Sequence, residues 1–213
     1  MLLSLYVDSQ YASPYAMSAF VGLREKGLDF EMLPVDLAAS ENREAAYAAK
    51  SLTQRVPTLV HGNFALSESS AIAEYLDETF PQPRLYSESP QTRARARQVQ
   101  AWLRSDLLPL RIERPTEVVF YGSSAPALSA AARNSAEKLF SFADSLLGQD
   151  AEHLFGQWSI ADVDLALMLN RLALHGDPVP TRLATYAARQ WKRPSIVRWL
   201  KQQRPPLLPS AAT

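Results

Sequence analysis

The segment from Arg55 to Ile72 constrains the fold of this chain more than any other part of its sequence. It reads as an X-Pro step, a short apolar strand, a two-residue Gly62-Asn63 turn, a second strand and the start of a helix. Ser67 is the expected N-cap of that helix, and Glu68 places negative charge in its first turn. The segment therefore predicts a β-hairpin followed directly by a helix.

The residues before this segment predict a strand, a helix and a second strand. Residues 2–7 are an apolar run short enough for a buried strand, and Phe30 to Val35 form another. Between these strands, Ser13 suits an N-cap, Pro14 suits the first helical position, and Gly27 suits the end of the helix. A further helix is expected over residues 43–50.

The second half of the chain lacks convincing strands and is expected to be helical. Helices are predicted over residues 91–108, 126–147, 160–174, 181–190 and 194–203, with a loose Pro-rich tail over 204–213. The Pro-rich run over residues 80–86 marks a boundary. The predicted fold class is therefore α/β plus all-α, with an N-terminal domain at 1–81, a linker at 82–89 and a helical domain at 90–213.

One of these helices begins with a capping signature, Ser159-Ile160-Ala161-Asp162, in which Asp takes the place of the usual Glu. Ser159 and Asp162 are therefore expected to be a structural cap, with no part in chemistry.

Composition excludes several classes of function. Lys and Arg number 22, as do Asp and Glu, so no net field favours nucleic acid or an anionic membrane as a partner. The chain has no cysteine, which excludes disulfides and protein-thiol chemistry. Its three histidines lack metal-ligand spacing, so no metal is expected. With no signal-peptide pattern and no apolar run of about 18 residues, the cytoplasm is the expected compartment.

The order Val-Pro-Thr-Leu, hairpin, Ser-Glu-Ser-x-Ala-Ile-x-x-Tyr-Leu resembles the glutathione-binding half of the glutathione S-transferase family. In that family the proline is cis, and the residue before it, here Val56, pairs with glutathione like an added strand. The resemblance also implies a thioredoxin-like βαβ-ββα domain with strands in the spatial order 2-1-3-4. A helical domain that contributes the acceptor-substrate site would follow it.

The same resemblance implies a set of glutathione-binding residues. Val56 and Pro57 would meet the cysteinyl part. Ser69 would offer its hydroxyl and backbone N–H to the γ-glutamyl carboxylate at a helix N-terminus, and Glu68 would face the ammonium. Arg55 aligns with a basic residue near the glycyl carboxylate, and Lys50 could substitute for it. A solvated loop cation is an equal alternative for Arg55.

Ser13 is the predicted catalytic residue. Ser13-Pro14-Tyr15 resembles the serine-type branch, which includes plant tau-class enzymes, and the later run 111–120 is similar to a bacterial YfcF-like branch. In the serine-type branch the hydroxyl hydrogen-bonds the glutathione sulfur. Ser9 is the runner-up because other branches place the serine or cysteine a few residues earlier, and Tyr6 is a third possibility. A simple N-cap is the structural alternative for Ser13.

Four arginines, Arg93, Arg97, Arg104 and Arg111, recur at intervals of four, seven and seven residues. A solvated or dimer-lining helix face is the favoured interpretation of this stripe. The resembled family places this helix at the cleft, so Arg111 and Arg114 are candidates to meet an acidic acceptor.

These features together predict a cytoplasmic, homodimeric glutathione transferase, with glutathione as co-substrate and no metal. Its thiolate would attack a small electrophile, and the branch resemblance also implies reduction of peroxides or disulfides. The competing hypothesis is a non-catalytic module that binds a ligand or a protein. Neither nucleic acid nor membrane is an expected partner.

Overall fold

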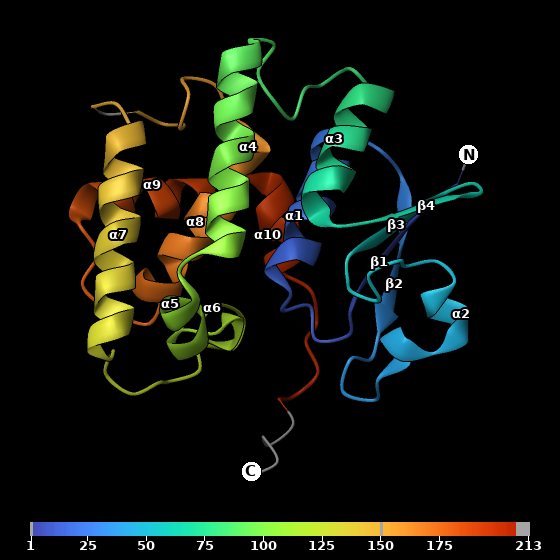
Figure 1. The fold of residues 1–213 in the computed structure, drawn as a ribbon, viewed down its shortest axis with the longest axis horizontal. Helices are drawn as coiled ribbons and strands as arrows, with labels where there is room; N and C mark the ends of the chain where they lie inside the picture. The colour runs from blue at the N-terminus through green and yellow to red at the C-terminus, as the bar shows by residue number, and fades with distance from the viewer. Residues whose placement is uncertain (1, 150, 208–213) are drawn as a thin grey trace.

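The structure is a computed structural model that describes residues 2–149 and 151–207. Figure 1 shows a β-sheet on one side of the molecule and a group of helices on the other, with α1 (Pro14–Glu25) and α3 (Ser69–Thr79) between them. Helix α1 contacts α3 and also α8 (Ile160–Ala173) and α10 (Pro194–Leu200) of the helical half. The first helix of the chain is therefore the element that joins the two halves.

The sheet has four strands in the order β2-β1-β3-β4, which confirms the predicted order. The strands are β1 (Leu3–Asp8), β2 (Phe30–Val35), β3 (Thr58–His61) and β4 (Phe64–Ser67). Strand β1 pairs parallel to β2 and antiparallel to β3, and β3 and β4 form the predicted hairpin. The helix expected over 43–50 is instead a 3-10 turn (Glu41–Arg43) followed by the short α2 (Ala45–Ala48). A thioredoxin-like domain thus precedes the helical one.

The helical half holds more helices than the sequence predicts. The elements after α3 are α4 (Pro90–Ser105), α5 (Leu108–Glu113), α6 (Thr116–Tyr121), α7 (Ala130–Leu146), α8, α9 (Thr181–Gln190) and α10. The helix predicted over 91–108 stops at Ser105, and Leu107 adopts a positive φ of 61° before α5 begins. Pro109 lies in the first turn of α5, where the backbone N–H has no partner within the helix. The proline therefore suits the start of a new helix.

The domain limits remain predictions, although α3 ends at Thr79 and α4 begins at Pro90. Residues 208–213 of the tail expected to be loose lie outside the described part of the chain. Arg204 contradicts that expectation, because its guanidinium donates to the carbonyls of Tyr11 and Trp199. No helix within residues 2–149 and 151–207 is long and apolar enough to span a membrane.

Helix α8 is buried along most of its length and is held at its start by Asp162. This carboxylate accepts from the N–H groups of Ser159 and Leu154, both at 2.8 Å, and from the Tyr186 hydroxyl at 2.8 Å. Burial raises the pKa of Asp162, and these donors oppose the shift. The expected capping contact with Ser159 is present, and it is one part of a larger buried network.

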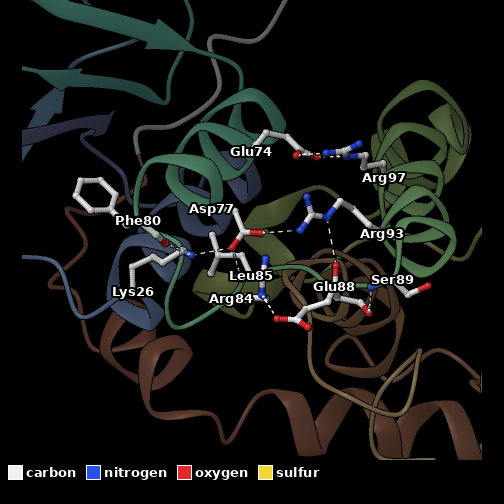
Figure 2. Close-up of polar contacts among 11 residues, drawn as sticks. Lys26, Glu74, Asp77, Phe80, Arg84, Leu85, Glu88, Ser89, Arg93 and Arg97 are labelled. Atoms are coloured by element: carbon white, nitrogen blue, oxygen red, sulfur yellow. Dashed lines mark hydrogen bonds and ion pairs between the residues drawn. The ribbon is translucent and has the colours of Figure 1, made fainter.

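A second buried carboxylate, Asp77 at the end of α3, connects three segments (Figure 2). It accepts from Lys26 Nζ at 2.7 Å and from the Leu85 N–H at 2.7 Å, and Arg93 Nη2 of α4 lies 3.7 Å away. Lys26 also donates to the Phe80 carbonyl at 2.6 Å, and its side chain has no exposed area. Asp77 therefore fixes the position of α1, the linker and α4 relative to α3.

We predict that Asp77→Asn lowers the free energy of unfolding by about 3–5 kcal/mol, because it leaves the buried Lys26 ammonium without an opposite charge. Adding Lys26→Met should recover part of this loss. The control is Glu74→Gln on the same helix, whose ion pair with Arg97 is half exposed and should contribute no more than about 1 kcal/mol. Denaturant titration measures both. Equal losses for Asp77→Asn and Glu74→Gln would contradict the assignment.

Candidate functional site

The residues expected to form the site lie around two adjoining cavities. The Ser13 cavity, of about 430 Å³, is lined by the start of α1, the loops after β1 and β2, and part of α6. The Ser69 cavity, of about 360 Å³, is lined by the start of α3 and by α4 and α5. Tyr15, Arg55 and Val56 line both cavities, so the two form one cleft. A larger cavity of about 580 Å³ by the linker contains none of the predicted binding or catalytic residues.

Ser13 is the N-cap of α1, as predicted, and its side chain lines the cleft. Its Oγ accepts from the Ala16 N–H at 3.2 Å. A hydroxyl that accepts at the helix start still has its own proton to donate. Ser13 can therefore cap α1 and donate a hydrogen bond into the cleft at the same time.

The loop that carries Ser13 is held by Asp8, the last residue of β1, which was not identified from the sequence. The buried carboxylate of Asp8 accepts from the N–H of Ala12 at 2.7 Å and from the N–H of Ser13 at 3.1 Å. Burial raises the pKa of Asp8, and the two N–H donors and the positive charge of Arg204 oppose the shift. No sequence pattern predicts this role, because it depends on the burial of Asp8 in the folded protein.

The two alternatives to Ser13 occupy different positions. Ser9 lines the Ser13 cavity, and its backbone N–H donates to the Val35 carbonyl at 2.9 Å. Tyr6 lies in the middle of β1 with its ring edge-on to Tyr47 at 5.6 Å, and it lines neither cavity of the cleft. Ser9 therefore remains a candidate on position, and Tyr6 has a packing role.

The peptide bond between Val56 and Pro57 is cis. The carbonyl of Arg55 accepts from the hydroxyls of Tyr47 at 2.8 Å and of Thr58 at 3.1 Å, which hold the loop before the proline in place. Among the described residues, neither the N–H nor the C=O of Val56 has a hydrogen-bond partner. Both groups are thus available to an extended ligand that lies along the cleft.

The helix after the hairpin begins one residue later than predicted. Ser67 is the last residue of β4, and the N-cap of α3 is Glu68, which has a φ of 73° and a ψ of 112°. Non-glycine residues rarely adopt such a conformation, and where they do they cluster at ligand sites. Glu68 itself is exposed, whereas Ser69 is 2% exposed at the first helical position.

Arg104 of α4 is a site residue that sequence reasoning named only as part of the arginine stripe. Its Nη2 donates to Ser69 Oγ at 3.1 Å and lies 3.4 Å from Asp164 Oδ2, and its guanidinium lies 5.7 Å from the ring centre of Tyr15. Arg104 thus brings a positive charge from the helical half to the start of α3. Its spacing in the sequence gave no indication of this partner.

The first three members of the arginine stripe lie on α4 and face α3 and the linker, and the interpretation as a solvated or dimer-lining face stays a prediction. Arg93 contacts Asp77 and the Ser87 carbonyl, and Arg97 pairs with Glu74. Arg111 does not belong to this helix face, since it lies on α5.

The two arginines that were predicted to meet an acidic acceptor have different surroundings in the structure. Arg111 lines the Ser69 cavity, and its Nη1 donates to the Tyr15 hydroxyl at 3.3 Å. Arg114 is fully buried and donates to both carboxylate oxygens of Asp177, at 2.6 and 2.8 Å. Arg114 is therefore a structural residue, and its assignment to the acceptor site is wrong.

Lys50 also lies away from the cleft: its Nζ donates to the Ala46 carbonyl at 3.0 Å and it lines neither cavity. Within residues 2–149 and 151–207, no cluster of three or more His, Asp or Glu side chains could hold a metal ion.

Two family models cover most of the chain. The glutathione S-transferase N-terminal domain matches residues 9–84, and the glutathione S-transferase C-terminal domain matches residues 89–203. A crystal structure of a glutathione transferase homologue from Burkholderia gl BGR1 with bound glutathione is 48% identical. It matches 94% of this chain and 97% of that chain, with a TM-score of 0.77.

Two curated relatives match shorter stretches of the chain. A maleylacetoacetate isomerase of Pseudomonas aeruginosa is 41% identical over 111 residues, which is 51% of this chain and 51% of the isomerase. Glutathione S-transferase U28 of Arabidopsis thaliana is 41% identical over 88 residues, 41% of this chain and 38% of the relative. The matches thus span about half of these relatives or less, and membership of the serine-type branch stays a prediction.

We predict that Asp8→Ala lowers the free energy of unfolding by about 2 kcal/mol, because it leaves two N–H groups of the loop without an acceptor. The matched control is Asp29→Ala, an exposed position, with a change within about 0.5 kcal/mol.

The pKa of Asp8 also gives a pH test in the variant Asp8→Asn. The folded protein binds the proton of Asp8 more tightly than the unfolded chain, because the folded pKa is raised above 3.8. The contribution of Asp8 to the free energy of unfolding must therefore rise as the pH falls towards 3.8, the unshifted pKa. The stability of the wild type relative to Asp8→Asn should increase between about pH 7 and pH 4. A flat or opposite difference would contradict the raised pKa.

Proposed function

Because the chain belongs to the glutathione S-transferase family, we propose that it is an enzyme that binds glutathione in this cleft and activates its thiol. The single observation that carries the proposal is the meeting of three features in one cleft: the cis Val56–Pro57 step, the Ser69 helix start and the Ser13 helix start. The thiolate would attack a small electrophile.

We propose the following orientation of glutathione in the cleft. The free N–H and C=O of Val56 would pair with its cysteinyl part. The γ-glutamyl carboxylate would meet Ser69 and the Arg104 guanidinium, with Glu68 beside the ammonium. The glycyl carboxylate would then lie near Arg55, which is exposed and forms no ion pair in the described part of the chain.

Activation of the thiol would rest on the start of α1. A thiol with a pKa of about 8.5 is only about 3% ionised at pH 7. A helix N-terminus contributes up to roughly 2 kcal/mol in a partly buried position, which lowers that pKa by about 1.5 units. A hydrogen bond from the Ser13 hydroxyl would then make the thiolate the main form. No base is needed, because Ser13 keeps its proton.

Reduction of organic hydroperoxides or disulfides is a finer proposal for the same site. The chain has no cysteine, so the second thiol must also come from glutathione. Two glutathione molecules would reduce ROOH to ROH and water and leave as the glutathione disulfide. A cytoplasmic location suits this chemistry, since thiols there stay reduced.

A non-catalytic binding module is the alternative. Such a protein would bind its ligand without accelerating any reaction of glutathione over the uncatalysed rate. An assay panel of glutathione with halogenated aromatics, hydroperoxides and disulfides separates the two hypotheses.

We also propose a homodimer. The exposed surface of α3 and α4 carries an open groove of about 570 Å³ lined by residues that include Ala71 and Ala101. We expect sedimentation at micromolar concentration to give twice the 23.7 kDa chain mass. Ala101→Arg should shift the protein towards the monomer, because it places a bulky charge on this surface, whereas Ala131→Arg on α7 should not. A monomeric wild type would reject the proposal.

The central prediction concerns Ser13 and Ser69. Ser13→Ala should raise the apparent pKa of the bound thiol and slow conjugation at pH 7, and the deficit should shrink above about pH 8.5. Glutathione affinity should hardly change. Ser69→Ala is the matched contrast, because it should weaken binding by about 1–2 kcal/mol and leave the pH profile in place.

Titration calorimetry and pH–rate profiles measure these effects. If Ser13→Ala keeps full activity and Ser9→Ala abolishes it, Ser9 supports the thiolate. If neither change matters, the backbone N–H groups at the start of α1 are its main support. Unchanged binding in Ser69→Ala would reject the orientation given above.

A further inference from the structure

Two arginine nitrogens beside the cleft are buried without a hydrogen-bond partner in the described part of the chain. They are Nε of Arg111 on α5 and Nε of Arg171 on α8. Neither arginine forms an ion pair within residues 2–149 and 151–207, whereas the neighbouring Arg104 and Arg114 pair with Asp164 and Asp177. Within the described residues, neither positive charge therefore stabilises the fold by pairing with a carboxylate.

Arg171 is the more unusual of the two. It is 5% exposed, and its Nη1 donates to the Arg114 carbonyl at 2.6 Å. Burial lowers the pKa of Arg171 to about 10, because the charged form loses its hydration. The attraction of Tyr15 and Glu117 opposes this shift, and the repulsion of Arg111 adds to it. A buried cation with no opposite charge in contact is costly, so a function for the charge is expected.

Tyr15 connects both arginines to the cleft. Arg111 donates to its hydroxyl and lines the Ser69 cavity beside it. Tyr15 also lines a small cavity of about 20 Å³, together with Arg171, Arg104 and Asp164. Asp164 is already engaged, because it accepts from Gln100 Nε2 at 2.7 Å and pairs with Arg104. Among the described residues, Arg111 and Arg171 are therefore the unpaired charges on this side of the cleft, and Glu117 of α6, which lines the Ser13 cavity, is the acidic group that opposes them.

We propose that the acceptor substrate carries a carboxylate, which binds Arg111 on the Tyr15 side of the cleft. Arg171, which lines the small cavity together with Tyr15, strengthens the positive potential at Arg111 without contacting the substrate. This inference rests on the proposed function, since it names the substrate class of the same site. From the sequence, Arg111 and Arg114 were the two cations predicted to meet an acidic acceptor. Arg171 takes the place of Arg114 as the second of these cations. In the orientation given above, Ser69, Arg104 and Arg55 meet the carboxylates of glutathione, so Arg111 in the same cavity is the cation left for the acceptor.

The kinetic test compares two acceptors that differ only in charge. They are 4-chloro-3-nitrobenzoate and its neutral amide, 4-chloro-3-nitrobenzamide, with each rate divided by the uncatalysed rate with glutathione. We expect kcat/KM to favour the acid by about tenfold or more, as for a charge-assisted hydrogen bond. Arg111→Gln should remove this preference by raising KM for the acid, so that the variant uses the acid and the amide equally well. Arg95→Gln, which removes an exposed cation on α4, should keep the preference.

A binding test separates this inference from the proposed function. With saturating S-methylglutathione, benzoate should bind the wild type in titration calorimetry, whereas benzamide should not. Arg111→Gln should abolish benzoate binding, and Arg171→Gln should weaken it several-fold. Arg171→Lys, which keeps the charge, should retain most of the affinity and provides a folded comparison if Arg171→Gln does not fold.

The outcomes are distinct. Equal use of acid and amide by the wild type, or no binding of benzoate, overturns the inference even if conjugation is fast. Weaker glutathione binding in Arg111→Gln with an unchanged acid preference also overturns it, and assigns Arg111 to glutathione. No conjugation of either acceptor rejects the proposed enzyme, while benzoate binding that depends on Arg111 would still support the carboxylate site.

Discussion

The Asp77 carboxylate is the contact on which the geometry of the cleft depends (Figure 2). It joins α3 to Lys26 at the end of α1, to Leu85 of the linker and to Arg93 of α4. A charge with so little exposed surface is stable only when its partners keep their positions. Because α4 is anchored there, its next turns run along α3 and bring Arg104 to the hydroxyl of Ser69. The site thus inherits its geometry from a polar contact that lies outside it.

The two halves of the molecule supply different chemistry to the cleft. The sheet domain contributes backbone groups and hydroxyls, namely the free N–H and C=O of Val56 and the side chains of Ser13 and Ser69. The helical domain contributes cations, of which Arg104 and Arg111 line the cleft. Hydroxyls and N–H groups can bind a common peptide-like ligand, whereas the spacing of cations selects an anionic one. In the proposed arrangement the first set and Arg104 bind glutathione, and Arg111 selects the acceptor.

Much of the site could be predicted because its parts are local in sequence. Ser13-Pro14 caps a helix within three residues, and the cis form of the Val56–Pro57 step was implied by the family resemblance. The prediction failed by one residue at Ser67, because the positive φ of Glu68 opposes its intrinsic preference. The break at Leu107 was missed for the same kind of reason: the surrounding chain holds a leucine in a conformation that its own propensity disfavours.

The sequence by itself determined the strands, most of the helices, the caps at Ser13 and Ser159 and the family resemblance, since apolar periodicity and capping residues act over only a few positions. Only the tertiary structure decided which charges face the cleft. Arg111 and Arg114 are three residues apart on one short stretch, yet one reaches Tyr15 and the other is enclosed by Asp177, 63 residues further along the chain. Such partners come from helices that pack after distant segments meet. Local spacing carries no information about them, because burial and the choice of counter-ion are properties of the assembled core.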